Sequence, residues 1–269
     1  METAKHYYEL MTDFAGFAIQ DRAIKKFTQE ALSATYNETL YKNHRNFFID
    51  PSSSSGKHHP PEDNGEGGIV RHLLKSAFVG PTLLQDHDLN IRKNEVLPRK
   101  LENGIITQKE YDVEIKTLNQ ISEKNDFYNF FTKTDYDMVI SANLIHDICK
   151  NCKDFEEPEG LLLGEWSNKT NYSHGLLGYN FLENFMLREP EKETIRQMVR
   201  KHMGQFPELT SELVKMEDTS ILEDICISSD RTAATKSMSF LPGNPLYKKQ
   251  FSERPTVKSL KKAWKQTRF

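Results

Sequence analysis

The sequence predicts an all-α protein, and three observations support this prediction. Nearly every segment with a regular apolar pattern repeats at spacings of three and four residues, and no alternating run of strand length occurs. The chain of 269 residues is 37% hydrophobic and 10% aromatic, which is enough for a real core. No stretch holds the roughly 18 apolar residues that a membrane helix requires. We therefore expect one helical domain spanning residues 1–269, with no membrane segment.

The first half of the chain is expected to hold three long helices and an insertion. Helices are predicted over residues 5–20 and 22–43. The Ser, Pro and Gly residues of 50–68 predict a loop, and a new helix starts at the glycines that end it. Residues 86–133 are charged and poor in apolar side chains, with two short helices predicted around Asn103–Gly104. We interpret this segment as a helical hairpin inserted in the domain.

The second half of the chain shows clear helix starts and one unusual helix end. An apolar run is typical of a buried helix but ends at the adjacent His146 and Asp147. Pro190 and the acids beside it are typical of a helix start. Ser220 and Glu223 have the spacing of a capping box ahead of the last strong helix.

The C-terminal segment, residues 247–269, is strongly basic. It carries eight Lys and Arg residues against one acid, a net of +7 that leaves −10 for the rest of a chain whose net charge is −3. Such asymmetry indicates a polyanionic partner, for example nucleic acid. Val257, Leu260 and Trp264 fall on one helical stripe, which predicts a docked helix. Its lysines would form a positive ridge or simply a solvated face (Lys258, Lys261, Lys262 and Lys265).

Cysteine usage and the N-terminus favour a cytoplasmic location. Three cysteines cannot make a disulfide framework, and the first residues lack the basic-then-apolar layout of a signal peptide. Cys149 and Cys152 form a C-x-x-C, but only Cys226 remains to complete a thiolate zinc site. We interpret this spacing as coincidental.

Six metal-capable residues occur on five predicted helices, on or at the end of apolar faces: His72, His146, Asp147, His174, His202 and Asp230. One such histidine is more often a hydrogen-bonded core residue than a ligand. Burying all six without a metal would need a separate partner for each, whereas a shared cation satisfies them together. Imidazole and carboxylate without thiolate suit Mn²⁺, Fe²⁺, Co²⁺, Ni²⁺ or Zn²⁺, with Mg²⁺ also possible.

The adjacent His146 and Asp147 can serve one site only at a helix end. Neighbouring side chains of a regular helix diverge by about 100°. The apolar run ends where this pair occurs, so the helix is expected to deliver both as ligands.

These residues resemble the HD superfamily of metal-dependent phosphohydrolases, whose signature is a helix histidine, an adjacent His-Asp and a distant Asp. His72, His146–Asp147 and Asp230 match in that order, and "HDICK" is close to the frequent HD-x-G-K form. The intermediate His174 and His202 match the branch of the family that holds two metals. The resemblance covers residues 58–235. The stretch "GGIVRH", with "HHPP" before it, is also similar to the HD-domain 3′–5′ exoribonucleases.

The resemblance implies a phosphohydrolase that acts on a nucleotide or nucleic-acid phosphoester, with a metal-activated hydroxide as nucleophile. Asp147 would bridge two metals, with His72, His146 and Asp230 on one of them and His174 and His202 on the other. His146 follows His72 by 74 positions, which is more than a compact HD domain needs and agrees with an inserted hairpin.

Four further residues are candidate substrate contacts. Lys150 could neutralise a phosphate oxygen, or could be a solvent-exposed lysine at a helix C-terminus. The loop with His58 and His59 leads to Arg71 and His72 and is expected to border the substrate entrance. Its glycines and prolines are expected to keep it out of the core, and plain surface histidines are the alternative.

Two other functions remain open at this point. HD-domain di-iron oxygenases, such as those resembling myo-inositol oxygenase, use the same H…HD…H…H…D order. A binding protein without activity could also keep the fold. The chain has neither P-loop nor Rossmann glycines, so a nucleoside mono- or triphosphate, a cyclic nucleotide and an oligonucleotide end all remain possible substrates.

Overall fold

The computed structural model describes residues 2–40, 47–52, 59–124, 131–151, 173–203, 219–234 and 255–265. Within these ranges every regular element is helical, which confirms the all-α prediction. No helix in them is both long and apolar enough to cross a bilayer. The α-helices are α1 (Glu2–Ala18), α2 (Arg22–Leu40), α3 (Gly68–Ile91), α4 (Leu97–Glu102), α5 (Gln108–Lys124), α6 (Lys133–Ile145), α7 (His174–Leu182), α8 (Glu189–Lys201), α9 (Ile221–Ala234) and α11 (Val257–Trp264). Short 3-10 turns lie at Phe47–Ile49 and Pro61–Asn64.

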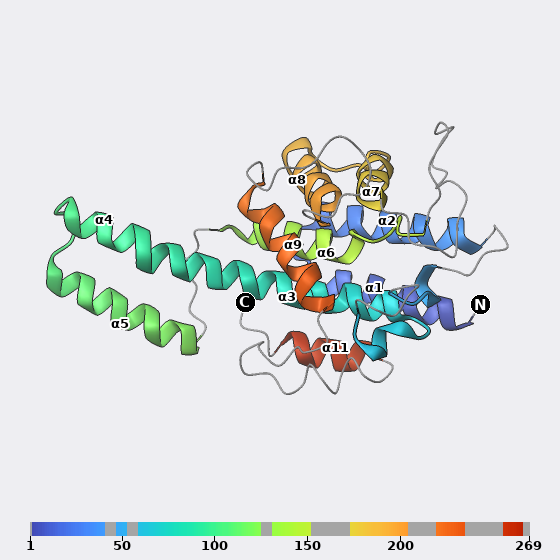
Figure 1. The fold of residues 1–269 in the computed structure, drawn as a ribbon, viewed down its shortest axis with the longest axis horizontal. Helices are drawn as coiled ribbons and strands as arrows, with labels where there is room; N and C mark the ends of the chain where they lie inside the picture. The colour runs from blue at the N-terminus through green and yellow to red at the C-terminus, as the bar shows by residue number, and fades with distance from the viewer. Residues whose placement is uncertain are drawn as a thin grey trace.

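The N-terminal half of α3 is the axis of the helical body (Figure 1). Helices α6 and α9 pack directly on it, and α8 joins α6 to α9 on the outer side. Helices α1 and α2 form a pair that covers α6, and α7 lies against α8. One continuous apolar core connects these helices. The side chains that α3 buries in its first four turns therefore face the centre of the molecule.

The helical hairpin projects away from this body (Figure 1). Helix α3 continues through a π-helical segment, Arg92–Val96, into α4, and α5 returns along it after a turn at Gly104 (φ 66°). The first arm is thus an extension of α3 rather than a separate short helix. Pro98 follows the π segment, and the wider turn there accommodates a ring that would clash with the carbonyl four residues earlier.

The predicted helix starts are present. At α9, the Ser220 amide donates to Glu223 Oε2 (2.6 Å) and the Glu223 amide donates to Ser220 Oγ (3.3 Å). Pro190 occupies the first turn of α8. Thr132 and Asp135 form a second capping box ahead of α6. Each box satisfies backbone amides that a helix start leaves without partners.

Helix α11 lies against α1 through its apolar stripe. Leu260 and Ala263 are buried, and the Trp264 ring lies 5.2 Å from each of the Phe14 and Phe78 rings. The four lysines from Lys258 to Lys265 are exposed. The rest of the basic segment, residues 247–254 and 266–269, lies outside the described residues.

Candidate metal centre

The six metal-capable residues come together where five helices meet. His72 belongs to the second turn of α3, and His146 and Asp147 follow the last turn of α6. His174 begins α7, His202 ends α8, and Asp230 belongs to α9. The four imidazoles and Asp147 are at most 2% exposed as side chains, and Asp230 is 17% exposed.

The two oxygens of Asp147 face different pairs of histidines. Oδ2 lies 3.8 Å from His72 Nε2 and 3.7 Å from His146 Nε2. Oδ1 lies 3.0 Å from His174 Nε2 and 3.5 Å from His202 Nε2. A carboxylate shared in this way can bridge two cations.

Asp230 completes the side of the centre that faces α3. Its Oδ1 lies 2.8 Å from His72 Nε2 and 3.4 Å from His146 Nε2. Neither contact has the alignment of a hydrogen bond, and both nitrogens are buried without a hydrogen-bond partner. Such orphaned nitrogens are costly unless a cation or solvent binds them. Three groups at the centre have donor atoms that lie within 4.8 Å of one another, close enough to share an ion: His72, His146 and Asp147; His146, His202 and Asp230; and Asp147, His174 and His202.

Helix-end carbonyls orient two of the rings. His146 Nδ1 lies 3.0 Å from the Asn143 carbonyl oxygen, and His202 Nδ1 lies 2.6 Å from that of Val199. A proton on Nδ1 would be donated to each carbonyl, which leaves the Nε2 lone pair free to bind a metal. This is the usual arrangement of histidine ligands.

Glycines permit the helices to approach closely enough to assemble the centre. A Cβ at Gly175 would lie 2.6 Å from the Arg200 carbonyl oxygen, and one at Gly178 would lie 2.8 Å from Val199 Cγ1. Without these side chains, α7 packs tightly on α8, and His174 Nε2 lies 2.9 Å from His202 Nε2. Gly80 serves the same purpose between α3, α6 and α9.

The electrostatics of the centre favour a positive charge. Burial would raise the pKa of Asp147, but Lys150 and then His146 outweigh it and hold that pKa well below the usual range. The imidazoles of His146 and His72 likewise hold the pKa of Asp230 down against burial. Burial lowers the pKa of His202 to about 4, so this ring is neutral at pH 7 and its nitrogen can bind a metal. The donor set therefore fits a divalent cation.

Lys150 is part of this centre. Its Nζ donates to Asp147 Oδ2 over 2.6 Å, and only 12% of its side chain is exposed. The side chain is therefore folded back onto the Asp147 carboxylate rather than extended into solvent.

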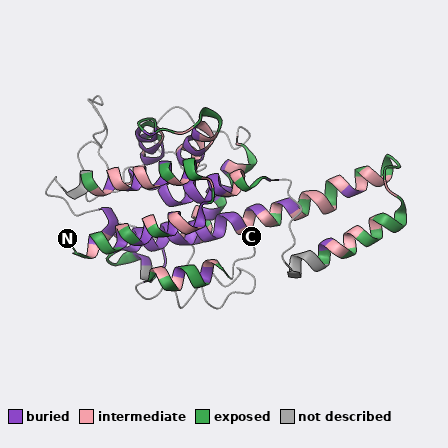
Figure 2. Ribbon diagram, turned by 180° about the vertical axis from the view of Figure 1, so that it is seen from behind, coloured by how far each residue is buried: buried purple, intermediate pink, exposed green. Residues whose placement is uncertain are grey.

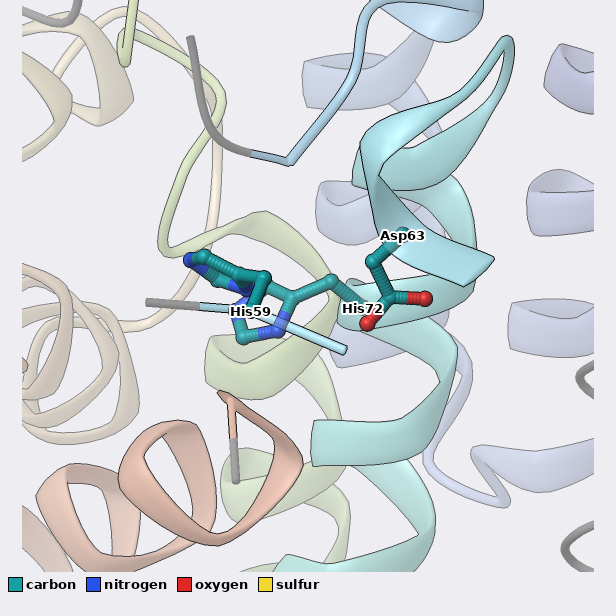
Figure 3. Close-up of side chains that lie close together, drawn as sticks. All are labelled: His59, Asp63 and His72. Atoms are coloured by element: carbon teal, nitrogen blue, oxygen red, sulfur yellow. The ribbon is translucent and has the colours of Figure 1, made fainter. Parts of the chain in front are cut away.

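Of the remaining candidate substrate contacts, two are buried and one lies outside the described residues. His59 is buried, and its ring lies 4.7 Å from that of His72 (Figure 3). The expectation that its loop stays out of the core is wrong for Pro60, Gly67 and Gly68, which are also buried, and is met at Pro61 and Gly65, which are exposed. Arg71 is buried and donates to the Glu66 carbonyl and to the Tyr7 hydroxyl. His58 lies outside the described residues.

Two cysteines are close to the centre in sequence, and both are buried thiols. Cys149 follows Asp147 by two residues, and burial raises the pKa of Cys226 on α9. Cys152 lies outside the described residues. Sequence reasoning did not identify the buried pair Asp63 and Lys75 beside the centre. A lysine one turn after His72 on an otherwise apolar face was the only signal that could have indicated it.

No family model, curated protein or solved structure matches this chain.

Proposed function

We propose that this protein is a metal-dependent phosphohydrolase with an HD-type centre, which acts on a nucleotide or nucleic-acid phosphoester. The observation that carries the proposal is the placement of Asp147, whose two oxygens face separate histidine pairs. Such a carboxylate suits two neighbouring cations, and paired cations suit in-line displacement at phosphorus.

The residues divide into two ligand sets around this carboxylate. His72, His146 and Asp230 would hold one cation with Asp147 Oδ2, and His174 and His202 would hold the other with Asp147 Oδ1. Bound divalent cations would supply Lewis-acid activation of water and of phosphoryl oxygens. The surrounding protein buries the imidazoles, which excludes bulk water and strengthens these interactions.

Lys150 is proposed to neutralise charge on the substrate. Its ammonium binds the same Asp147 oxygen that faces His72 and His146. A cation at that oxygen would compete with the ammonium, which is then free to contact a phosphoryl oxygen as a point charge.

The test is a panel of nucleoside mono- and triphosphates, cyclic nucleotides and short oligonucleotides incubated with the protein and Mn²⁺. We expect release of phosphate or of a shorter phosphoester, identified by mass spectrometry. Oxygen uptake by the iron-loaded protein without hydrolysis of any phosphoester would instead favour the di-iron oxygenase. A protein that binds two metals but shows neither hydrolysis nor oxygen uptake would contradict the proposal that it is an enzyme.

The lysines of α11 are proposed to attract the nucleic-acid end of a longer substrate. They are exposed on a helix whose apolar stripe is docked on the body. Reversal of Lys261, Lys262 and Lys265 to Glu should weaken oligonucleotide binding much more than mononucleotide binding. The difference should shrink with salt, because salt screens this attraction over roughly 10 Å at 0.1 M. If the parent and the triple mutant bind oligonucleotides with equal affinity at low salt, the lysines of α11 are only a solvated face.

A further inference from the structure

Residues 59–68, which we call the strap, form a fixed wall beside the metal centre. The Ser52 amide and hydroxyl both donate to the Asp63 carbonyl, over 2.9 and 3.0 Å. Gly67 has a positive φ of 69°, and a Cβ there would lie 2.2 Å from the Tyr7 ring. The strap is therefore held on both sides by tight backbone contacts.

A buried ion pair attaches the strap to α3. Lys75 Nζ donates to both oxygens of Asp63, each over 2.9 Å, and neither side chain is more than 2% exposed. Arg71 adds a bond to the strap through the Glu66 carbonyl (2.9 Å). Because Lys75 lies one turn after His72 on α3, this pair fixes the strap in register with a metal-centre histidine.

The strap carries His59 to the side of the centre formed by His72. The two rings are 4.7 Å apart and nearly perpendicular, with Asp63 beside them (Figure 3). His59 Nδ1 is buried, and no described residue hydrogen-bonds to it. A buried imidazole with an unsatisfied nitrogen is costly unless a ligand completes it.

A third metal ion is the less favourable occupant. His59, Asp63 and His72 do have donor atoms within 4.8 Å of one another. However, the Lys75 ammonium already binds both oxygens of Asp63, and a cation at that carboxylate would face this charge at close range. Asp63 is thus an anchor for the strap. Among the described residues, no group close enough to share one ion joins His59 to His146, Asp147 or Asp230.

We propose that His59 is a substrate-contact residue, whose imidazole donates a hydrogen bond to an oxygen of a phosphoryl group bound at the His72 side of the centre. This inference rests on the proposed function. An anionic oxygen supplies the acceptor that the protein does not provide, and a hydrogen bond to a charged acceptor is stronger than a neutral one. The metals should bind without His59, because the other ligands are complete.

The experiment titrates inorganic phosphate into the Mn²⁺-loaded full-length protein by calorimetry, with metal content measured in parallel. His59→Phe keeps a ring against His72 and removes both nitrogens, whereas His59→Gln restores a donor. We expect His59→Phe to keep the parent manganese content and to bind phosphate about tenfold more weakly, equivalent to ~1.4 kcal/mol. His59→Gln should recover part of the loss. His87→Ala, far along α3, is the matched control and should behave as the parent.

The outcomes separate this inference from the function on which it rests. Loss of manganese in both His59 variants would make His59 a metal ligand and overturn the inference. Unchanged phosphate affinity in a folded His59→Phe protein, with the parent binding phosphate, would leave His59 a packing residue and the proposed function intact. Failure of the metal-loaded parent to bind phosphate would overturn both. Circular dichroism verifies the fold, and His59→Ala replaces His59→Phe if the larger ring prevents folding.

Discussion

Helix α3 passes through two regions that bury very different side chains. In the body its first four turns are almost fully buried and include the polar residues His72, Lys75 and Ser76. In the hairpin the buried residues of the small core are Leu97 and Leu118, and both arms are largely exposed or half-buried (Figure 2). Most of the polar residues that this helix buries thus lie where other helices surround it, although Asp88, closer to the hairpin, is also buried.

This difference indicates where the sequence is constrained by function. Desolvating polar groups is unfavourable unless they are paired, so a fold gains little from placing several of them in its core. The hairpin, by contrast, has an ordinary pattern of a few apolar contacts and a charged surface. Substitutions of one residue type in the two regions should therefore have unequal effects.

The largest contrast is expected between Asp147→Ala and Asp112→Ala. Loss of the proposed bridging carboxylate removes the group common to both proposed ligand sets, so the proposed hydrolysis should fall at least about a thousandfold, or ~4 kcal/mol of barrier. Asp112 is exposed on α5 and accepts a hydrogen bond from Gln108, so its loss should leave the rate unchanged. Initial rates at saturating Mn²⁺ measure both. Retention of activity within about tenfold in Asp147→Ala would rule out the bridging role.

Metal content provides the next contrast. His174→Ala or His202→Ala should reduce the bound divalent metal from about two per chain to about one, because each removes a ligand facing Asp147 Oδ1. His87→Ala removes a half-buried ring stacked on Phe131 near the hairpin and should retain the parent content. Elemental analysis after dialysis measures the number of metal ions bound per chain. One metal in both parent and variants would mean a mononuclear centre.

Glycine substitutions compare packing in the two regions. A Cβ at Gly80 would lie 2.6 Å from Asn143 Nδ2 and 2.7 Å from Val139 Cγ1. Gly80→Ala should therefore lower the free energy of unfolding by about 1–3 kcal/mol, as overpacking does. Gly104 has a φ of 66° but open space around it, so Gly104→Ala should lower it by about 1 kcal/mol through backbone strain alone. Urea titrations measure both values, and a larger loss at Gly104 would contradict this account of the packing.

Sequence reasoning succeeded where the determinants are local. Helix periodicity predicted the all-α class, and the capping box at Ser220 and Glu223 is present. The pair at His146 and Asp147 does occur at a helix end, as its adjacency required. These features depend on residues within a few positions of one another, so a single sequence contains the information.

Sequence reasoning failed for the buried residues of the strap because their burial depends on distant partners. Pro and Gly in that stretch are ordinary loop signals, and the buried residues are held by contacts with Tyr7, Ser52 and Lys75. The continuity of α3 with α4 was also missed, because Pro98 is a local signal for a helix boundary. The π segment that accommodates this proline has no comparable sequence signal.

Substitutions in the apolar core of the hairpin are expected to have the smallest effect on the metal centre. Leu118 packs with Leu97 in a cluster separate from the main core, so Leu118→Ala should loosen the hairpin by about 2–5 kcal/mol locally. Hydrogen exchange should accelerate in α4 and α5 while the body and the metal content stay as in the parent. Val113→Ala, on the exposed side of α5, should change neither the hydrogen exchange of the hairpin nor the metal content. If Leu118→Ala instead released metal or lowered protection throughout α6 and α9, the hairpin and the body would unfold as one unit. The two halves of α3 would then be coupled despite the difference in what they bury.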